Sequence, residues 1–72
     1  MNEGHTIHVR LNGKNREIGS GLSVKELIKS LDLNPQLIVV ELNREIISKD
    51  SLSEIQVLDG DQLELVHFVG GG

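Results

Sequence analysis

The fold is decided by one stretch in the first half of the chain, SVKELIKSL at residues 23–31. Ser23 and Glu26 have the spacing of a capping box, in which each side chain accepts a hydrogen bond from the other residue's free backbone N–H. The apolar residues that follow recur at the spacing of one helix face: Val24, Leu27, Ile28 and Leu31. We therefore predict an amphipathic helix that begins after Ser23 and packs on one apolar surface.

Two strands are predicted before this helix. Apolar and polar residues alternate over residues 6–11, which is the pattern of a strand with one buried face. Asn12-Gly13 follows directly and tolerates the positive φ values of a tight type I′ turn. Residues 14–18 then return as a polar strand, which we place at an edge of the sheet.

The second half of the chain supplies the rest of the sheet. Asn34-Pro35 ends any helical continuation, because the residue before a proline is forced toward extended geometry. The predicted elements then follow in order: a nearly continuous apolar central strand at 38–42, a turn at Asn43-Arg44, a short strand at 45–47, a polar turn with a short helical piece at 48–53, a tight turn at 58–61 and a last strand at 63–69.

These elements make one two-layer α+β domain over residues 1–69, followed by a flexible glycine tail at 70–72. A single amphipathic helix covers one face of a sheet. If the first and last strands pair in parallel, they need a crossover, which the helix supplies. We predict a β-grasp (ubiquitin-like) roll, a mixed sheet of four to five strands covered on one face by one helix.

Composition excludes several functional classes. The 72 residues contain no cysteine, which removes disulfides, thiol nucleophiles and thiolate metal sites. A net charge of −4 and a single aromatic residue offer nucleic acid neither a cationic surface nor a stacking platform. There is no apolar run long enough to span a bilayer and no secretory signal pattern, so we expect a cytoplasmic protein that binds no membrane and is a monomer when alone.

The acidic residues are concentrated in the second half of the chain. Residues 37–72 carry two Lys or Arg against seven Asp or Glu, a balance of −5. Such a surface can steer the protein toward a basic partner. The simpler interpretation is that these charges keep a small domain in solution.

Two other patterns carry less weight. His5, His8 and His67 could face one way around a metal ion, but no carboxylate is spaced with them as a further ligand, so we expect solvated histidines. Gly19-Ser20-Gly21 precedes the helix as a phosphate-binding loop would. It lacks the third glycine of the dinucleotide fingerprint and the lysine of the P-loop, so we expect a connection without a ligand. A self-sufficient enzyme is not expected, because so small a domain has little volume for an enclosed pocket.

The three glycines at 70–72 are the most informative feature. A segment without side chains can thread a narrow tunnel and present the terminal carboxylate of Gly72 to the active site of another protein. There the carboxylate can be activated as an acyl-adenylate and attacked by a nucleophile. The alternative interpretation is an inert end of the chain.

A candidate docking patch lies just before the tail. If Leu63 and Leu65 point into the core, the two-residue period of a strand sends Val66 and Phe68 to the opposite face. We expect both to lie beside Val39, on the side that the helix does not cover, as a patch for a partner protein. A bulge that turns Phe68 back into the core is the alternative.

Taken in order, the motifs resemble those of the ThiS family, the thiamine-biosynthesis sulfur carrier proteins with a ubiquitin-like β-grasp fold. The resemblance covers Thr6 to Gly72. It rests on Asn12-Gly13, on VELNREII at 40–47, on LDGDQLELV at 58–66 and on VGGG at 69–72. Glu41 and Arg44 stand where the family usually has small residues, so contacts around the Asn43 turn differ from the family pattern.

The resemblance implies a carrier that is a protein substrate rather than an enzyme. An adenylating enzyme of the ubiquitin-activating type uses ATP to adenylate the Gly72 carboxylate, and the carrier itself binds no cofactor. Sulfur from a cysteine desulfurase or a related donor replaces AMP to give a thiocarboxylate. Thiazole synthase then takes the sulfur into the thiazole ring of thiamine. Gly72 is the covalent carrier residue, and Gly70 and Gly71 provide clearance.

Three other functions compete with this one. The molybdopterin-synthase small subunit uses the same thiocarboxylate chemistry, but it usually has a proline-containing segment before its terminal glycines, and Pro35 is the only proline here. A ubiquitin-like modifier would attach Gly72 to lysines. A non-catalytic β-grasp interaction module would keep every activity without Gly71 and Gly72.

Overall fold

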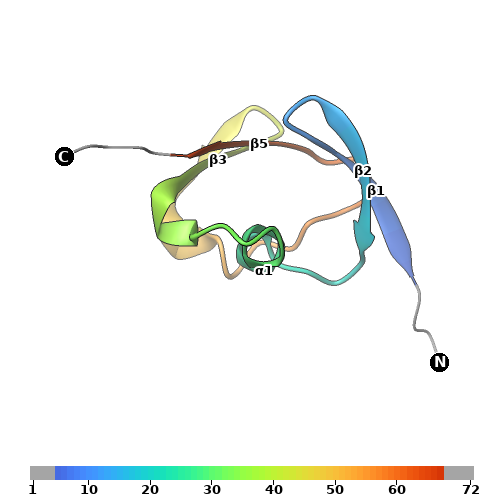
Figure 1. Cartoon of the computed structure of the whole chain (residues 1–72), viewed down its shortest axis with the longest axis horizontal. Helices are drawn as coiled ribbons and strands as arrows, with labels where there is room; N and C mark the ends of the chain where they lie inside the picture. Colours follow the sequence, from blue (N-terminus) through green and yellow to red (C-terminus); the bar gives the residue numbers. More distant parts are fainter. Residues whose placement is uncertain (1–4, 68–72) are drawn as a thin grey trace.

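The computed structural model describes residues 5–67 and places five strands of this segment in one mixed sheet (Figure 1). The strands are β1 Thr6–Leu11, β2 Lys14–Gly19, β3 Ile38–Leu42, β4 Glu45–Ile47 and β5 Gln62–His67, joined by the helix α1 Val24–Ser30 and the 3₁₀ helices η1 Pro35–Leu37 and η2 Lys49–Ser51. Their order across the sheet is β2-β1-β5-β3-β4, with β1 parallel to β5 and the other neighbours antiparallel. The predicted β-grasp roll is confirmed.

Helix α1 begins where the capping box was predicted. The backbone N–H of Glu26 donates to Oγ of Ser23 at 3.0 Å, and the N–H of Ser23 donates to Oε1 of Glu26 at 2.9 Å. The helix ends at Ser30, before the proline, and Asp32 takes a positive φ of 63°. Pro35 then opens η1, whose first turn is capped by the Asn34 side chain. The sequence pattern did not predict η1.

The core lies between α1 and one face of the sheet (Figure 1). Its buried residues are Val9, Leu11, Val24, Leu27, Ile28, Ile38, Val40, Leu52, Val57, Leu63 and Leu65. All of them are aliphatic, and none of the buried residues in the described segment is polar. The stability of this small domain therefore rests on aliphatic burial, which contributes roughly 1.5–3 kcal/mol for each large side chain.

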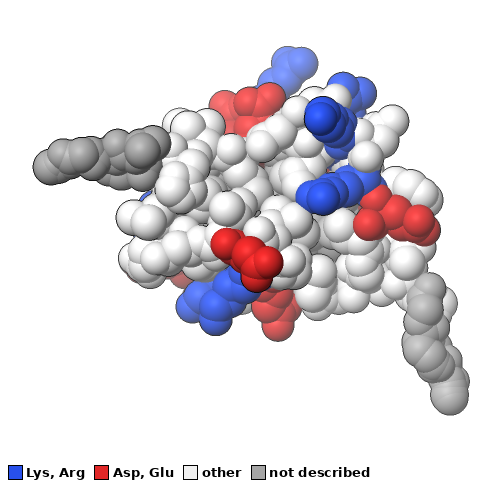
Figure 2. Space-filling model, viewed as in Figure 1, with Lys and Arg blue, Asp and Glu red and all other residues white. Residues whose placement is uncertain are grey.

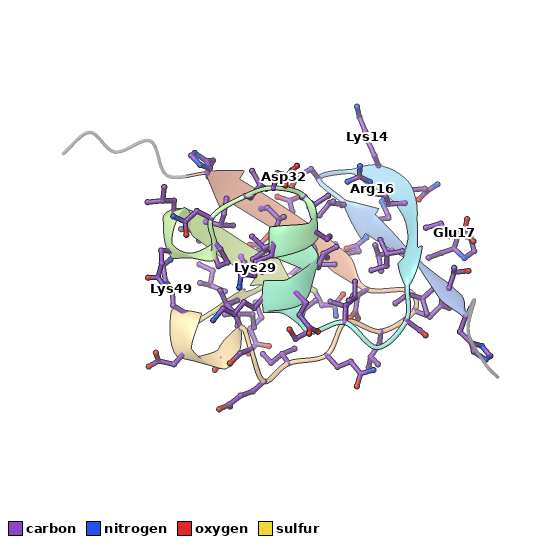
Figure 3. The ribbon with its side chains drawn as sticks, turned by 60° about the horizontal axis from the view of Figure 1, so that its bottom comes forward. Lys14, Arg16, Glu17, Lys29, Asp32 and Lys49 are labelled. Carbon is purple, nitrogen blue, oxygen red and sulfur yellow. The ribbon has the colours of Figure 1, made fainter. Side chains whose placement is uncertain are left out.

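Strand β2 forms one edge of the sheet, as predicted. Figure 3 shows Lys14 and Glu17 of β2 projecting away from the body of the protein, and Lys29 on α1. Charged side chains along an edge strand discourage pairing with another chain.

Two asparagine turns hold β5 from opposite sides. Asn12 has a φ of 53° in the β1–β2 turn, and its Oδ1 accepts the backbone N–H of Leu65 at 2.8 Å. Asn43 has a φ of 51° in the β3–β4 turn, and its Oδ1 accepts the N–H of Gln62 at 2.9 Å. Both hairpins thus fix the strand that leads to the glycine tail.

Candidate docking face at the base of the tail

The face of the sheet opposite α1 is built by strand alternation. Val40 and Leu65 are paired across β3 and β5 and are buried under the helix. Their neighbours along the strands must therefore point to the other side. Residues paired directly opposite each other share a face. We call this surface the open face, formed by Val39, Glu41, Ile46, Glu64 and Val66.

The predicted position of Val66 beside Val39 is confirmed. The two residues are direct cross-strand partners, and their side chains are 59% and 40% exposed. They therefore present an apolar pair to solvent, and Val66 lies one residue before His67, the last described residue of β5. Their role in docking stays a prediction, and Phe68, Gly70, Gly71 and Gly72 lie outside the described residues.

Ile46 enlarges this surface and was missed from the sequence. It lies on β4 opposite Glu41 and is 70% exposed, the highest exposure among the large apolar residues described. The expected strand at 45–47 was correct, but three residues are too few for alternation to reveal which one faces solvent. The pairing of Glu41 with Ile46 supplies that information.

A shallow hollow of about 260 Å³ lies on the same side of the sheet, between the two asparagine turns. It is lined by Arg10, Gly13, Glu41, Arg44, Gln62, Leu63 and Glu64. Figure 1 shows the two hairpins rising on the side of the sheet away from α1. Nη2 of Arg10 donates to the carbonyl oxygen of Gly13 at 3.0 Å, which ties this guanidinium to its own hairpin.

The histidines and the glycine loop show no ligand-binding arrangement in the described segment. His5, His8 and His67 are all exposed. Residues 5–67 contain no group of three or more His, Asp or Glu side chains that could hold a metal ion. Gly19 belongs to β2, and the N–H of Ser20 donates to the carbonyl of His5, so this loop continues the sheet.

Charged residues of both signs are distributed over the surface seen in Figure 2. Lys and Arg lie next to Asp and Glu there, and no large field of one sign covers this side. Of the helices in the described part, none is long and apolar enough to cross a membrane. The open face combines the exposed apolar residues Val39, Ile46 and Val66 with the facing glutamates Glu41 and Glu64.

Several known proteins and one family model are similar to this chain. The model of the ThiS family matches residues 9–72. The sulfur carrier protein ThiS of Bacillus subtilis (strain 168) is 38% identical over 68 residues, covering 89% of this chain and 98% of the relative. The crystal structure of a thiamine biosynthesis protein (ThiS) from Geobacter metallireducens has a TM-score of 0.78 and 32% identity, covering 92% of this chain and 100% of that one.

Larger proteins contain a similar segment. A thiazole synthase of Paramagnetospirillum magneticum (strain ATCC 700264 / AMB-1) is 39% identical over 62 residues, which cover 86% of this chain and 19% of that relative. A thiazole synthase of Magnetococcus marinus (strain ATCC BAA-1437 / JCM 17883 / MC-1) matches over 92% of this chain and 20% of its own length, with 31% identity. This chain thus spans about a fifth of the thiazole synthases that it matches.

Proposed function

This chain belongs to the ThiS family of sulfur carriers for thiamine biosynthesis, and we propose that it holds the sulfur as a thiocarboxylate on Gly72. The main observation behind this proposal is that the family match extends through residue 72 and so includes the three terminal glycines. The carrier is not an enzyme, because the chemistry is done to its carboxylate by other proteins. Gly70 and Gly71 supply the clearance that lets this carboxylate enter a narrow active site.

The proposed reaction begins on an adenylating enzyme of the ubiquitin-activating type. The carboxylate of Gly72 attacks the α-phosphorus of ATP, and pyrophosphate leaves. A persulfide from a cysteine desulfurase or a related donor then attacks the acyl carbon, and AMP leaves. A thiol cleaves the resulting acyl disulfide to give the thiocarboxylate. We place these steps in the cytoplasm, where ATP and reducing thiols are available.

Thiazole synthase is the proposed acceptor of the sulfur. Two relatives that bear this name contain a segment similar to this chain within a much longer protein. A carrier and the enzyme that uses its cargo gain effective concentration when they are joined in one chain. The same association favours thiamine biosynthesis over the molybdenum cofactor pathway.

The exposed pair Val39 and Val66 is the proposed docking patch for these partners, and we assign Phe68, which lies outside the described residues, to the same role. Two large apolar side chains exposed side by side gain free energy when a partner covers them. Val66 lies on β5, the last described strand, so we place the partner that receives the glycines further along the chain at this patch.

Intact-protein mass spectrometry tests the proposed function. The full chain is incubated with ATP, cysteine, a desulfurase, a thiol reductant and the adenylating enzyme of its organism. We expect the mass to rise by the difference between sulfur and oxygen. A chain that ends at Gly70 is the matched control and should keep its mass. An unchanged mass of the full chain would refute the proposal, provided that the same enzyme preparation loads sulfur onto another carrier protein that is known to accept it.

A further inference from the structure

The two asparagine turns differ in the residue that follows the asparagine. Asn12 and Asn43 both have a left-handed backbone, with φ values of 53° and 51°, and the side chain of each accepts a backbone N–H of β5. Both asparagines are exposed to solvent. Asn12 is followed by Gly13, whereas Asn43 is followed by Arg44. The two turns therefore hold the same strand in the same way, but their asparagines differ in how easily they react with the backbone.

An asparagine side chain can react with the backbone nitrogen of the next residue. This nitrogen attacks Cγ and loses its proton, and the side-chain nitrogen leaves as ammonia, which closes a five-membered imide ring. Water then opens the ring. Cleavage of the bond to Cγ gives aspartate, and cleavage of the bond to the α-carbonyl carbon gives isoaspartate, in which the main chain runs through the former side chain. A following glycine favours the attack, because it has no Cβ to crowd the nitrogen and its backbone turns freely.

We propose that Asn12 is a modification site that deamidates spontaneously, and that the isoaspartate formed there releases β5. Gly13 is exposed, and apart from its chain neighbours no heavy atom lies within 4 Å of the place where a Cβ would be. The turn therefore has room for the nitrogen of Gly13 to move toward Cγ once the Asn12 side chain leaves Leu65. At Asn43 the side chain of Arg44 crowds the corresponding nitrogen, so we expect this asparagine to persist. The inference does not depend on the sulfur chemistry.

Isoaspartate at position 12 disturbs both the turn and the strand that it holds. The turn has only two residues, since Leu11 and Lys14 are paired, and an additional main-chain atom does not fit a turn of this length. The oxygen that accepts the N–H of Leu65 at 2.8 Å becomes part of the new peptide group and moves with it. A partly buried N–H that loses its acceptor destabilises the folded state.

Incubation of the folded full chain in neutral buffer tests the site. Each deamidation makes the net charge of −4 one unit more negative, so ion-exchange chromatography separates the product. Peptide mapping by mass spectrometry then locates the change from amide to carboxyl. We expect conversion at Asn12 to be at least about tenfold faster than at Asn43, because only Asn12 precedes a glycine. Conversion at Asn12 that is no faster than at Asn43, including no conversion at either, would overturn the inference.

Exchanging the residue after each asparagine provides matched variants. Arg44→Gly gives Asn43 the same neighbour as Asn12 and relieves a positive φ of 72°, so this variant should fold and deamidate at both turns. Gly13→Arg gives Asn12 the neighbour of Asn43 and should slow its conversion. Arg44 already adopts a positive φ in the other hairpin, so an arginine can occupy such a turn. Conversion rates that stay the same in both variants would also overturn the inference.

Hydrogen exchange measures the release of β5. The amide of Leu65 should exchange faster in the purified isoaspartate form than in Asn12→Asp. That variant is the matched control, because it has the same mass and charge as the isoaspartate form but retains an acceptor oxygen on its side chain. Equal protection of Leu65 in the two proteins would show that isoaspartate does not release the strand and would overturn this part of the proposal.

Discussion

Asn12 shows how one side chain extends the sheet. Strand β1 ends at Leu11, yet the next N–H of β5 on this side, that of Leu65, donates to Oδ1 of Asn12 at 2.8 Å. The asparagine side chain therefore acts in place of a strand carbonyl, while its backbone makes the turn. The Asn-Gly pair predicted the turn because its backbone preference is local, but the contact with Leu65 spans 53 positions and depends on the assembled sheet.

Replacing Asn12 by glycine should loosen β5. Asn12→Gly keeps the positive φ but removes the acceptor, so we expect a loss of about 1 kcal/mol of unfolding free energy. The amide of Leu65 should also exchange its hydrogen faster. Urea unfolding and amide hydrogen exchange measure the two effects.

Asn12→Asp is the control for this prediction. An aspartate tolerates the left-handed region and retains an acceptor oxygen at the same position. Leu65 should therefore stay protected in Asn12→Asp. Equal exchange rates of the Leu65 amide in the two variants would show that the side-chain acceptor does not hold the strand.

Among the elements, those governed by local rules were predicted closely. The capping box placed the start of α1, and alternation placed β1 with the same bounds that the structure shows. The turn at Asn43-Arg44 was also expected, but the positive φ of 72° at Arg44 was not. A residue other than glycine rarely adopts such a φ, and Arg44 does so because the tight hairpin requires it. Such strain is a property of the closed hairpin and has no signature in the sequence.

The open face of the sheet was predicted in part. Alternation along β5 indicated that Val66 points away from the core, and the paired strand confirmed Val39 as its neighbour. The facing pair of Glu41 and Glu64 was not predicted, because the register between β3 and β5 is set by pairing of residues far apart in the chain. That the carboxylates of Glu41 and Glu64 face each other can be recognised only once the register between β3 and β5 is known.

Val66→Glu tests the docking patch at this scale. The substitution puts a charge on a side chain that is 59% exposed, so the fold should persist while the rate of sulfur loading falls about tenfold or more. Leu58→Glu is the matched control, because Leu58 is 58% exposed and lies in the turn before β5. Loading kinetics followed by intact mass should leave this control unchanged. Equal loading rates in both variants would remove Val66 from the docking surface.

At the scale of the whole molecule, the aliphatic core and the proposed docking surface lie on opposite faces of one sheet. The side under α1 contains the aliphatic core, and the open face contains the exposed Val39, Ile46 and Val66 with the facing glutamates Glu41 and Glu64. Residues of the first kind follow periodic patterns and were predictable. The residues of the open face could be identified only from the structure, because the sequence pattern does not say which apolar residues stay exposed. Their exposure depends on the sheet order β2-β1-β5-β3-β4.

This division predicts that the fold and the sulfur chemistry can be lost separately. Leu27 is 1% exposed in the core, and Leu27→Ala should lower the free energy of unfolding by about 2–5 kcal/mol. Sulfur loading of this variant should fall only in proportion to its unfolded fraction. Deletion of Gly71 and Gly72 should leave the free energy of unfolding unchanged and abolish loading. Urea unfolding and intact-mass measurements on both variants test this, and a deletion that destabilises the domain would show that the glycines belong to the fold.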